Sequence, residues 1–264
     1  PLRRAPAMAA ATAAPPGGRP ELPPGVELLT RTYEFEPPAD GGEEWPPLEV
    51  AQDPTGLLAG GVGATIWDAG LVLSKYLESP ACQPILAGRI WLELGSGTGI
   101  VGLVAAALGA RVVLTDRRIS LPLLRWNLEC HAGRFAHPPA IEELDWVELA
   151  AESARGSEPG LVQRLRGAGL WPVDGLIVAD CTYLEEMVDP LVSAVSALTQ
   201  GEERRTELLL AHEFRKPAVD ARVFAALEER LGGALRRVPD ADLHPDWRCD
   251  EIGVWRGTLV APKG

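Results

Sequence analysis

Cysteine is scarce in this sequence of 264 residues, and its four copies stand far apart. Cys82, Cys130, Cys181 and Cys249 show no C-x-x-C spacing, so the sequence indicates neither a zinc cage nor a disulfide framework. The four histidines are equally scattered. We therefore expect no metal site, and a reducing compartment, the cytoplasm and also the nucleus, as the location.

Long apolar runs and an excess of positive charge are also missing. Gly, Arg and Pro interrupt each apolar stretch before it reaches the length that spans a membrane. Asp and Glu number 37 against 25 Lys and Arg, which gives a net charge of −12. A surface that binds a phosphate backbone needs positive charge, so we expect neither nucleic acid nor a membrane as partner. This charge favours a neutral small molecule or a basic protein segment, and monomer is the expected state.

Proline is concentrated at the N-terminus: residues 1–54 hold 12 of the 24 prolines. We expect residues 1–30 to form a disordered Pro/Ala-rich tail, because a segment so rich in Pro, Ala and Gly cannot bury a core. Alternating polar and apolar residues over 31–35 and 48–50 predict a β-hairpin. Apolar content of 46% suits one globular core, so residues 31–264 are predicted to form a single domain.

The most informative stretch is a glycine-rich loop between an apolar strand (90–94) and an alanine-rich helix (100–107). Such glycines adopt positive φ, and the helix N-terminus offers unpaired N–H groups to a ligand. Read from Gly97 to Gly102, the loop matches the dinucleotide fingerprint G-x-G-x-x-G. Read from Glu93, it matches the acidic-x-G-x-G-x-G pattern of S-adenosylmethionine-dependent methyltransferases. The apolar residues end at Leu94, so Gly95 opens the turn, and this phasing favours the methyltransferase interpretation.

Strands and helices alternate through the rest of the chain. Strands are predicted over 90–94, 111–115, 141–144, 173–179, 207–211, 234–237 and 253–260. Helices are predicted over 66–77, 100–107, 119–131, 185–199 and 219–231, with 150–169 partly helical. This order predicts an α/β fold, a Rossmann-like, doubly wound sheet of seven mostly parallel strands with an antiparallel C-terminal hairpin.

Side chains able to bind a ligand follow four of these strands. They are Glu93, Asp116, the pair Asp145-Trp146, and the segment Asp180-Cys181-Thr182-Tyr183. Ligands bind at the carboxyl ends of parallel strands, so we expect these groups to converge on one crevice. Asp116 suits a ribose diol, and Asp145-Trp146 suits an adenine amine and its ring. An aspartate at a strand end is also a common helix cap, and that alternative stays open for Asp116 and Asp180.

Four motifs together resemble one family. They are Ala-Thr-Ile-Trp-Asp-Ala at 64–69, the loop at 92–99, Leu-Arg-Trp-Asn-Leu at 124–128, and Asp-x-x-Tyr at 180–183. The sequence is similar over residues 60–260 to the seven-β-strand protein-lysine methyltransferases called methyltransferase family 16. The resemblance is strongest to the methyltransferase-21-like branch that includes the valosin-containing-protein lysine methyltransferase. It implies the class I methyltransferase fold.

The resemblance also implies a cofactor and a set of site residues. The cofactor is S-adenosyl-L-methionine. Its expected binding residues are Trp67, Glu93, Gly95, Ser96, Gly97, Thr98, Gly99, Asp116, Asp145, Trp146 and Ala179. The expected catalytic residues are Asp180 and Tyr183, at the acceptor. His212-Glu213-Phe214-Arg215 resembles a Glu-x-Arg stretch of the valosin-related member, whereas the insertion at 150–169 departs from the family pattern.

The activity expected from the sequence is methylation of a lysine ε-amine in a partner protein. A lysine ammonium, with a pKa of about 10.4, must lose a proton before it can accept a methyl group. Asp180 is expected to anchor the ammonium and Tyr183 to orient the amine, with Glu213 as a third candidate. Two alternatives remain: a methyltransferase for a small-molecule amine, and a catalytically silent cofactor-binding module.

Overall fold

The computed structural model describes residues 21–37, 44–199, 205–231 and 235–260, and its centre is a seven-stranded sheet of order β5-β4-β3-β6-β7-β9-β8. The strands are β3 (Ile90–Leu94), β4 (Arg111–Asp116), β5 (Ala140–Glu143), β6 (Gly175–Ala179), β7 (Arg205–Glu213), β8 (Arg236–Arg237) and β9 (Ile252–Val260). The first five in chain order pair in parallel, whereas β9 runs antiparallel to both β7 and β8. The predicted parallel sheet with an antiparallel C-terminal hairpin is confirmed.

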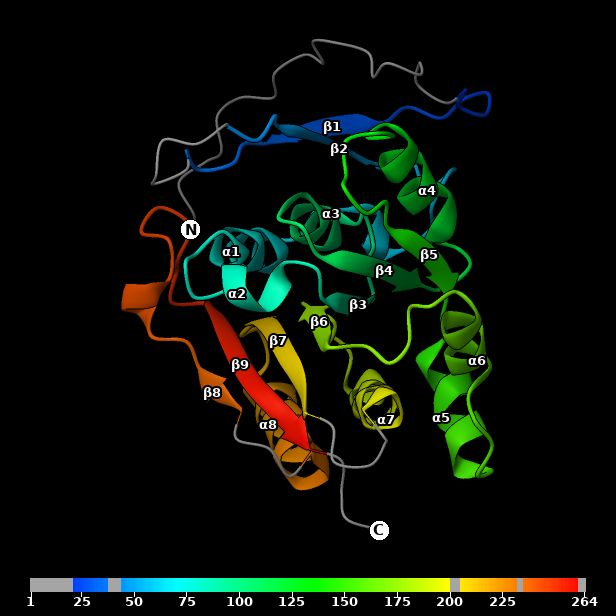
Figure 1. The fold of residues 1–264 in the computed structure, drawn as a ribbon, viewed down its shortest axis with the longest axis vertical. Helices are drawn as coiled ribbons and strands as arrows, with labels where there is room; N and C mark the ends of the chain where they lie inside the picture. Colours follow the sequence, from blue (N-terminus) through cyan, green and yellow to red (C-terminus); the bar gives the residue numbers. More distant parts are fainter. Residues whose placement is uncertain (1–20, 38–43, 200–204, 232–234, 261–264) are drawn as a thin grey trace.

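Helices cover both faces of the sheet (Figure 1). One layer holds α1 (Asp68–Leu77), α2 (Gln83–Leu86), α3 (Ile100–Ala107) and α4 (Leu121–Glu129). The other holds α5 (Trp146–Ala154), α6 (Gly160–Gly167), α7 (Val188–Leu198) and α8 (Pro217–Leu231). Short 3₁₀ turns lie at η1 (Val62–Ala64), η2 (Glu185–Met187) and η3 (Asp240–Asp242). None of the helices described is long and apolar enough to cross a bilayer.

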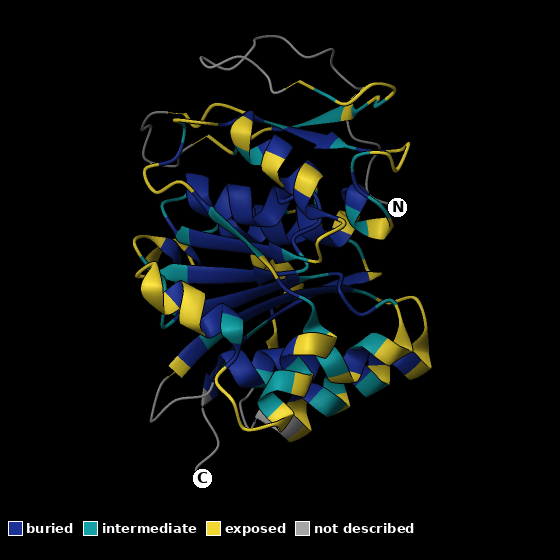
Figure 2. Ribbon diagram, turned by 90° about the vertical axis from the view of Figure 1, so that its right-hand side faces the viewer, coloured by how far each residue is buried: buried dark blue, intermediate teal, exposed yellow. Residues whose placement is uncertain are grey.

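The strands are apolar on both faces because each face carries a helical layer. In β3 successive side chains alternate, so Trp91 belongs to the core cluster that includes α1 and α3, while Leu92 belongs to the cluster that includes α7. Figure 2 shows the sheet buried between helices whose exposed residues face outward. Gly175 pairs with Trp91 across the β3–β6 ladder, and a Cβ at Gly175 would lie 2.4 Å from the indole ring. Glycine therefore allows the large side chain to sit in the middle of the sheet.

An N-terminal hairpin lies outside this sheet. Strands β1 (Leu29–Tyr33) and β2 (Leu48–Gln52) pair antiparallel over their full length. The buried amide of Asn127 in α4 joins β2 to the glycine loop: Asn127 Oδ1 accepts from Ala51 N at 2.8 Å, and Nδ2 donates to Ala51 O at 3.0 Å and to Thr98 O at 2.8 Å. Residues 1–20 of the predicted tail lie outside the described part of the chain, and β1 begins within the range assigned to that tail.

Two segments differ from the sequence prediction. The excursion predicted over 150–169 forms two helices, α5 and α6, and α5 begins already at Trp146. The Asp145 carboxylate causes this early start, since it accepts from Val147 N at 2.8 Å and satisfies a free N–H of the first turn. Strand β7 is longer than the predicted 207–211, because β9 pairs with it along all nine residues.

Candidate active site

A cavity of about 1070 Å³, part of it open to solvent, lies at the carboxyl ends of β3, β4 and β6. Most of the residues that the sequence assigns to cofactor or acceptor line it. These are Trp67, Glu93, Gly95, Ser96, Gly97, Thr98, Asp116, Trp146, Ala179, Asp180 and Tyr183. Segments from five parts of the chain therefore meet at one opening, and four of them lie at or after strand ends, as expected for parallel strands that end at a common edge.

Gly99 and Asp145 have other places in the structure. Gly99 precedes α3 with φ 85°, and a Cβ there would lie 2.6 Å from Leu124 Cδ1, so this glycine serves the packing of α4. Asp145 Oδ1 caps α5. Neither is among the residues that line the cavity. The interpretation of Asp145 as a partner of an adenine amine is therefore not supported by its position.

The glycine loop is shaped for close approach of a ligand to the main chain. Gly95 (φ 69°) and Gly97 (φ 55°) both adopt the left-handed region. A Cβ at Gly97 would lie 2.8 Å from Gly63 O, and one at Gly95 would lie 2.8 Å from Cys181 Sγ. Gly102, the last glycine of the dinucleotide pattern, lies inside α3 rather than in the turn. This position agrees with the phasing that favours S-adenosylmethionine.

Two carboxylates line the cavity next to this loop. Glu93 in β3 is buried, and Gly102 N–H donates to its Oε2 at 3.2 Å. Burial raises the pKa of Glu93 to about 8, with the nearby Asp116 charge adding to the rise and hydrogen bonds from Ser96 and Gly102 opposing it. Asp116 Oδ2 accepts from Gly97 N at 2.8 Å. Within the described ranges no ion pair involves Glu93, and such a buried carboxylate fits a bound ammonium group, while Asp116 retains lone pairs for hydroxyl donors.

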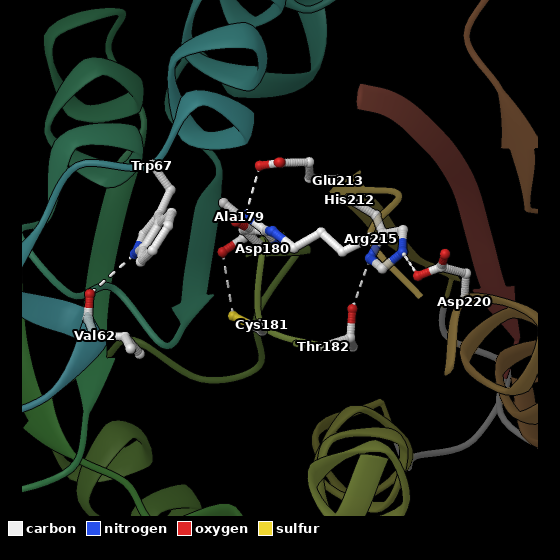
Figure 3. Close-up of polar contacts among 10 residues, drawn as sticks. All are labelled: Val62, Trp67, Ala179, Asp180, Cys181, Thr182, His212, Glu213, Arg215 and Asp220. Carbon is white, nitrogen blue, oxygen red and sulfur yellow. Dashed lines mark hydrogen bonds and ion pairs between the residues drawn. The ribbon is translucent and has the colours of Figure 1, made fainter. Parts of the chain in front are cut away.

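Trp67 stands at the wall of the cavity just before α1 and is 40% exposed. Its Nε1–H donates to Val62 O at 2.9 Å, which fixes the indole against η1 (Figure 3). The Arg215 guanidinium carbon lies 5.3 Å from the centre of its ring, within the range of a cation–π contact. An exposed aromatic face beside the glycine loop is suited to cover a bound ligand.

Asp180 follows β6 in an unusual backbone conformation. Its φ of 54° makes it the one non-glycine residue with positive φ in the described ranges. Its side chain is 4% exposed, and its carboxylate receives two hydrogen bonds from the Arg215 guanidinium, each of 2.7 Å. Arg215 also pairs with Glu213 (Figure 3). Sequence reasoning noted Arg215 only within the Glu-x-Arg resemblance and gave it no role.

The rest of the D-x-x-Y segment has its own contacts. Burial raises the pKa of the Tyr183 phenol, so the hydroxyl is protonated at neutral pH. Thr182 Oγ1 and His212 Nδ1 are 2.8 Å apart, and His212 Nε2 lies 2.8 Å from Asp220 Oδ1. All three of these side chains are buried. Across the described ranges, no group of three or more His, Cys, Asp or Glu side chains could hold a metal ion.

Comparison with known sequences places these features in one family. A family model described as lysine methyltransferase matches residues 46–230. Mouse protein N-lysine methyltransferase METTL21A is 33% identical over 186 residues, which cover 70% of this chain and 76% of that protein. Yeast (Saccharomyces cerevisiae) protein-lysine N-methyltransferase EFM6 is 31% identical over 175 residues, which cover 60% of this chain and 66% of that protein.

Solved structures share the fold. The Thermus thermophilus 16S rRNA N2 G1207 methyltransferase RsmC, in complex with AdoMet and guanosine, superposes with a TM-score of 0.55 at 18% identity, covering 91% of this chain and 52% of that one. SMU.776, complexed with SAH, superposes with a TM-score of 0.51 at 13% identity, covering 90% and 57%. The chain thus spans little more than half the length of these two structures. At such identities the likeness concerns the fold, and it confirms the predicted fold class.

The family model covers well over half of the chain, and the relatives agree with it. The predictions of a methyltransferase and of S-adenosyl-L-methionine as its cofactor are confirmed on this basis. This chain belongs to the lysine methyltransferase family.

Proposed function

We propose that this protein transfers a methyl group from S-adenosyl-L-methionine to the ε-amine of a lysine in a partner protein. The observation that carries the proposal is that one cavity joins the glycine loop to the D-x-x-Y segment. Gly97 and Asp116 of the cofactor-binding segments and Asp180 and Tyr183 of the D-x-x-Y segment all line it. The names of the relatives, protein N-lysine methyltransferase METTL21A and protein-lysine N-methyltransferase EFM6, support a protein as the acceptor.

Each part of the cofactor has a suitable partner in the chain. Glu93 would accept from the α-ammonium, and Asp116 from the ribose hydroxyls. Trp146 would flank the adenosine moiety, and Trp67 would cover the open side of the cavity. When bound, the cofactor supplies a methyl group activated by a positive sulfonium. The chain's contribution is to hold donor and acceptor in line, since positioning accounts for much of the rate in such transfers.

The acceptor end of the cavity is suited to a single positive charge. Asp180, which lines the cavity, and Glu213, which does not, carry two negative charges, and Arg215 compensates one of them. The remaining negative charge favours an entering lysine ammonium, and the Tyr183 hydroxyl would orient the amine once its proton is lost. Burial raises the pKa of Glu213, with Arg215 opposing the rise, so we keep this carboxylate as a candidate to take that proton.

The charge of the whole chain supports the same kind of partner. A net charge of −12 attracts a basic protein segment and repels a phosphate backbone. We therefore expect a protein acceptor rather than nucleic acid. A monomer that works in the cytoplasm and nucleus remains our expectation.

Labelling tests the proposal. The protein is incubated with a cell lysate and methyl-radiolabelled cofactor, and labelled proteins are hydrolysed to identify the modified amino acid. The proposal predicts methyl-lysine, and no label with Gly97→Val. Label in the small-molecule fraction would instead support an amine metabolite as substrate. Absence of any label, although calorimetry shows that the cofactor binds, would support a catalytically silent module.

A further inference from the structure

The carboxylate expected to meet the substrate lysine is already paired inside the chain. Both Asp180 oxygens accept from Arg215, and the two distances are equal at 2.7 Å. A bidentate guanidinium fork fixes the plane of a carboxylate as well as its charge. This matters at Asp180, because a left-handed backbone is strained for a residue with a Cβ and persists only where the surroundings hold it.

A chain of buried hydrogen bonds, here called the brace, runs from Thr182 through His212 and Asp220 to the main chain of Lys216. A carboxylate can only accept, so His212 donates from Nε2 to Asp220 Oδ1, while its Nδ1 is hydrogen-bonded to the Thr182 hydroxyl. Asp220 Oδ2 in turn accepts from Lys216 N at 3.2 Å. Thr182 lies two residues after Asp180, and Lys216 is the residue after Arg215. The brace therefore fixes the backbone on both sides of the ion pair.

The same guanidinium also reaches the cofactor side of the cavity. It lies 5.3 Å from the centre of the Trp67 ring (Figure 3). One side chain therefore contacts both the acceptor carboxylate and the aromatic wall. Arg215 itself is not among the residues that line the cavity, so it acts on the site through these two neighbours.

From these contacts we propose that Arg215 is a positioning residue for methyl transfer: it holds the Asp180 carboxylate in one orientation at the acceptor end of the cavity. This inference rests on the proposed function, because it takes a lysine ammonium as the group that meets Asp180. Two of the four lone pairs of the carboxylate remain for that ammonium once Arg215 has taken the others.

Arg215→Ala and Arg215→Lys test the role against Arg256→Ala as a matched control. Arg256 in β9 forms an ion pair with Glu207, and its side chain is about as exposed as that of Arg215. Glu207 lies near the start of β7, whereas Arg215 follows the end of that strand. For Arg215→Ala we expect kcat to fall about 100-fold, with the affinity for S-adenosylhomocysteine within a few-fold of wild type. Arg215→Lys keeps the charge but loses the fork, and we expect a loss of about tenfold. Arg256→Ala is expected to lower the melting temperature and leave kcat within twofold.

Chemical rescue separates positioning from folding. Millimolar guanidinium should restore part of the activity of Arg215→Ala, beyond the effect of sodium chloride at the same ionic strength. Arg215→Ala with wild-type kcat would overturn the inference, and so would a loss that guanidinium does not reverse and that Arg256→Ala reproduces. A wild-type protein that labels no lysine overturns the proposed function, and this inference with it. Wild-type activity that survives in the Arg215 variants overturns this inference alone.

If Arg215→Ala does not fold, the brace provides the test. Thr182→Val removes one buried hydroxyl at nearly constant volume, and Thr199→Val does the same at the C-cap of α7, where Thr199 Oγ1 donates to Val195 O at 2.9 Å. We expect similar losses of stability from the two variants, but a fall in kcat of about tenfold only from Thr182→Val. Equal kcat values would show that the brace does not position the site.

Discussion

The two ends of the cavity are built in different ways. On the cofactor side, which comprises Glu93, residues 95–99 and Asp116, the shape comes from backbone: positive φ, and a main-chain N–H held by Asp116. On the acceptor side, which comprises residues 180–183, Glu213 and Arg215, it comes from side chains joined across 35 positions of sequence. The cofactor side depends on a short backbone motif that many sequences can share. The acceptor side depends on side chains that only the complete fold brings together, and these can vary with the substrate.

If this contrast is right, the largest single effect belongs to a backbone change on the cofactor side. Gly97→Val adds a branched Cβ 2.8 Å from Gly63 O at φ 55°, a conformation that valine avoids. We expect affinity for S-adenosylhomocysteine to fall by at least about 100-fold, measured by calorimetry. Gly167→Ala is the control, because nothing lies within 4 Å of the added Cβ and its φ is not positive. Unchanged affinity in Gly97→Val would refute the assignment of the loop.

On the acceptor side, a substitution should change turnover rather than cofactor binding. Asp180→Asn suits the test, because asparagine tolerates positive φ better than other non-glycine residues. We expect kcat to fall about 100-fold, while affinity for S-adenosylhomocysteine stays within a few-fold. Asp189→Asn, which alters a surface carboxylate paired with Arg222, serves as control. An Asp180→Asn enzyme with full turnover would remove Asp180 from the acceptor site.

The pH dependence of binding probes Glu93. Its pKa of about 8 means that the carboxyl is protonated in the free protein at neutral pH, and a bound ammonium would draw it to the charged form. Affinity for S-adenosylhomocysteine should therefore rise between about pH 6 and 8. The affinity of 5′-methylthioadenosine, which lacks the ammonium, should stay level, and Glu93→Gln should flatten the slope for S-adenosylhomocysteine. Equal slopes for the two ligands would contradict this role.

The same shift has a consequence for stability. The folded-state pKa of Glu93 lies above the ordinary value of 4.5, so the unfolded chain loses this proton first as pH rises. The contribution of Glu93 to stability is thus fully present below about pH 4.5 and is lost as pH rises through about 8. In ligand-free protein at alkaline pH, Glu93→Gln should raise the melting temperature relative to wild type, and the gain should shrink toward acid pH.

The smallest expected effect is at Asp145, where the sequence suggested a ligand contact and the structure has a helix cap. Asp145→Ala should cost about 1 kcal/mol of unfolding free energy in urea, and Asp145→Ser should cost less. Cofactor affinity should not change, since Asp145 does not line the cavity. A loss of affinity without a loss of stability would restore its interpretation as an adenine contact.

These contrasts explain what the sequence could predict. The parallel strands, the glycine loop and Asp116 follow from apolar patterning and from a motif within a few residues, which local physics determines. Trp146 was expected to follow a strand, yet it begins α5, because the capping carboxylate of Asp145 opens a helix at that point. Its indole still lies close to the glycine loop, 3.1 Å from the position of a Cβ on Gly95.

The pairing of Asp180 with Arg215 could not be predicted from the sequence, for a different reason. Both residues follow strand ends, and β6 and β7 are neighbours in the sheet, so proximity could be inferred from topology. Which side chain faces which depends on the positive φ of Asp180 and on the buried contact of Thr182 with His212. Neither feature leaves a pattern in residue types. Long-range side-chain geometry therefore required the structure.

The side-chain amide of Asn127 connects the N-terminal hairpin to the cofactor side of the cavity. A single side chain connects the main chain of β2 with Thr98 O in the glycine loop. The hydrogen bonds of this one amide therefore hold both the hairpin and the loop in place. Linkage works in both directions, so we expect a ligand that stabilises the loop to stabilise the docked hairpin, and a partner that binds the hairpin to raise the affinity for the methyl donor.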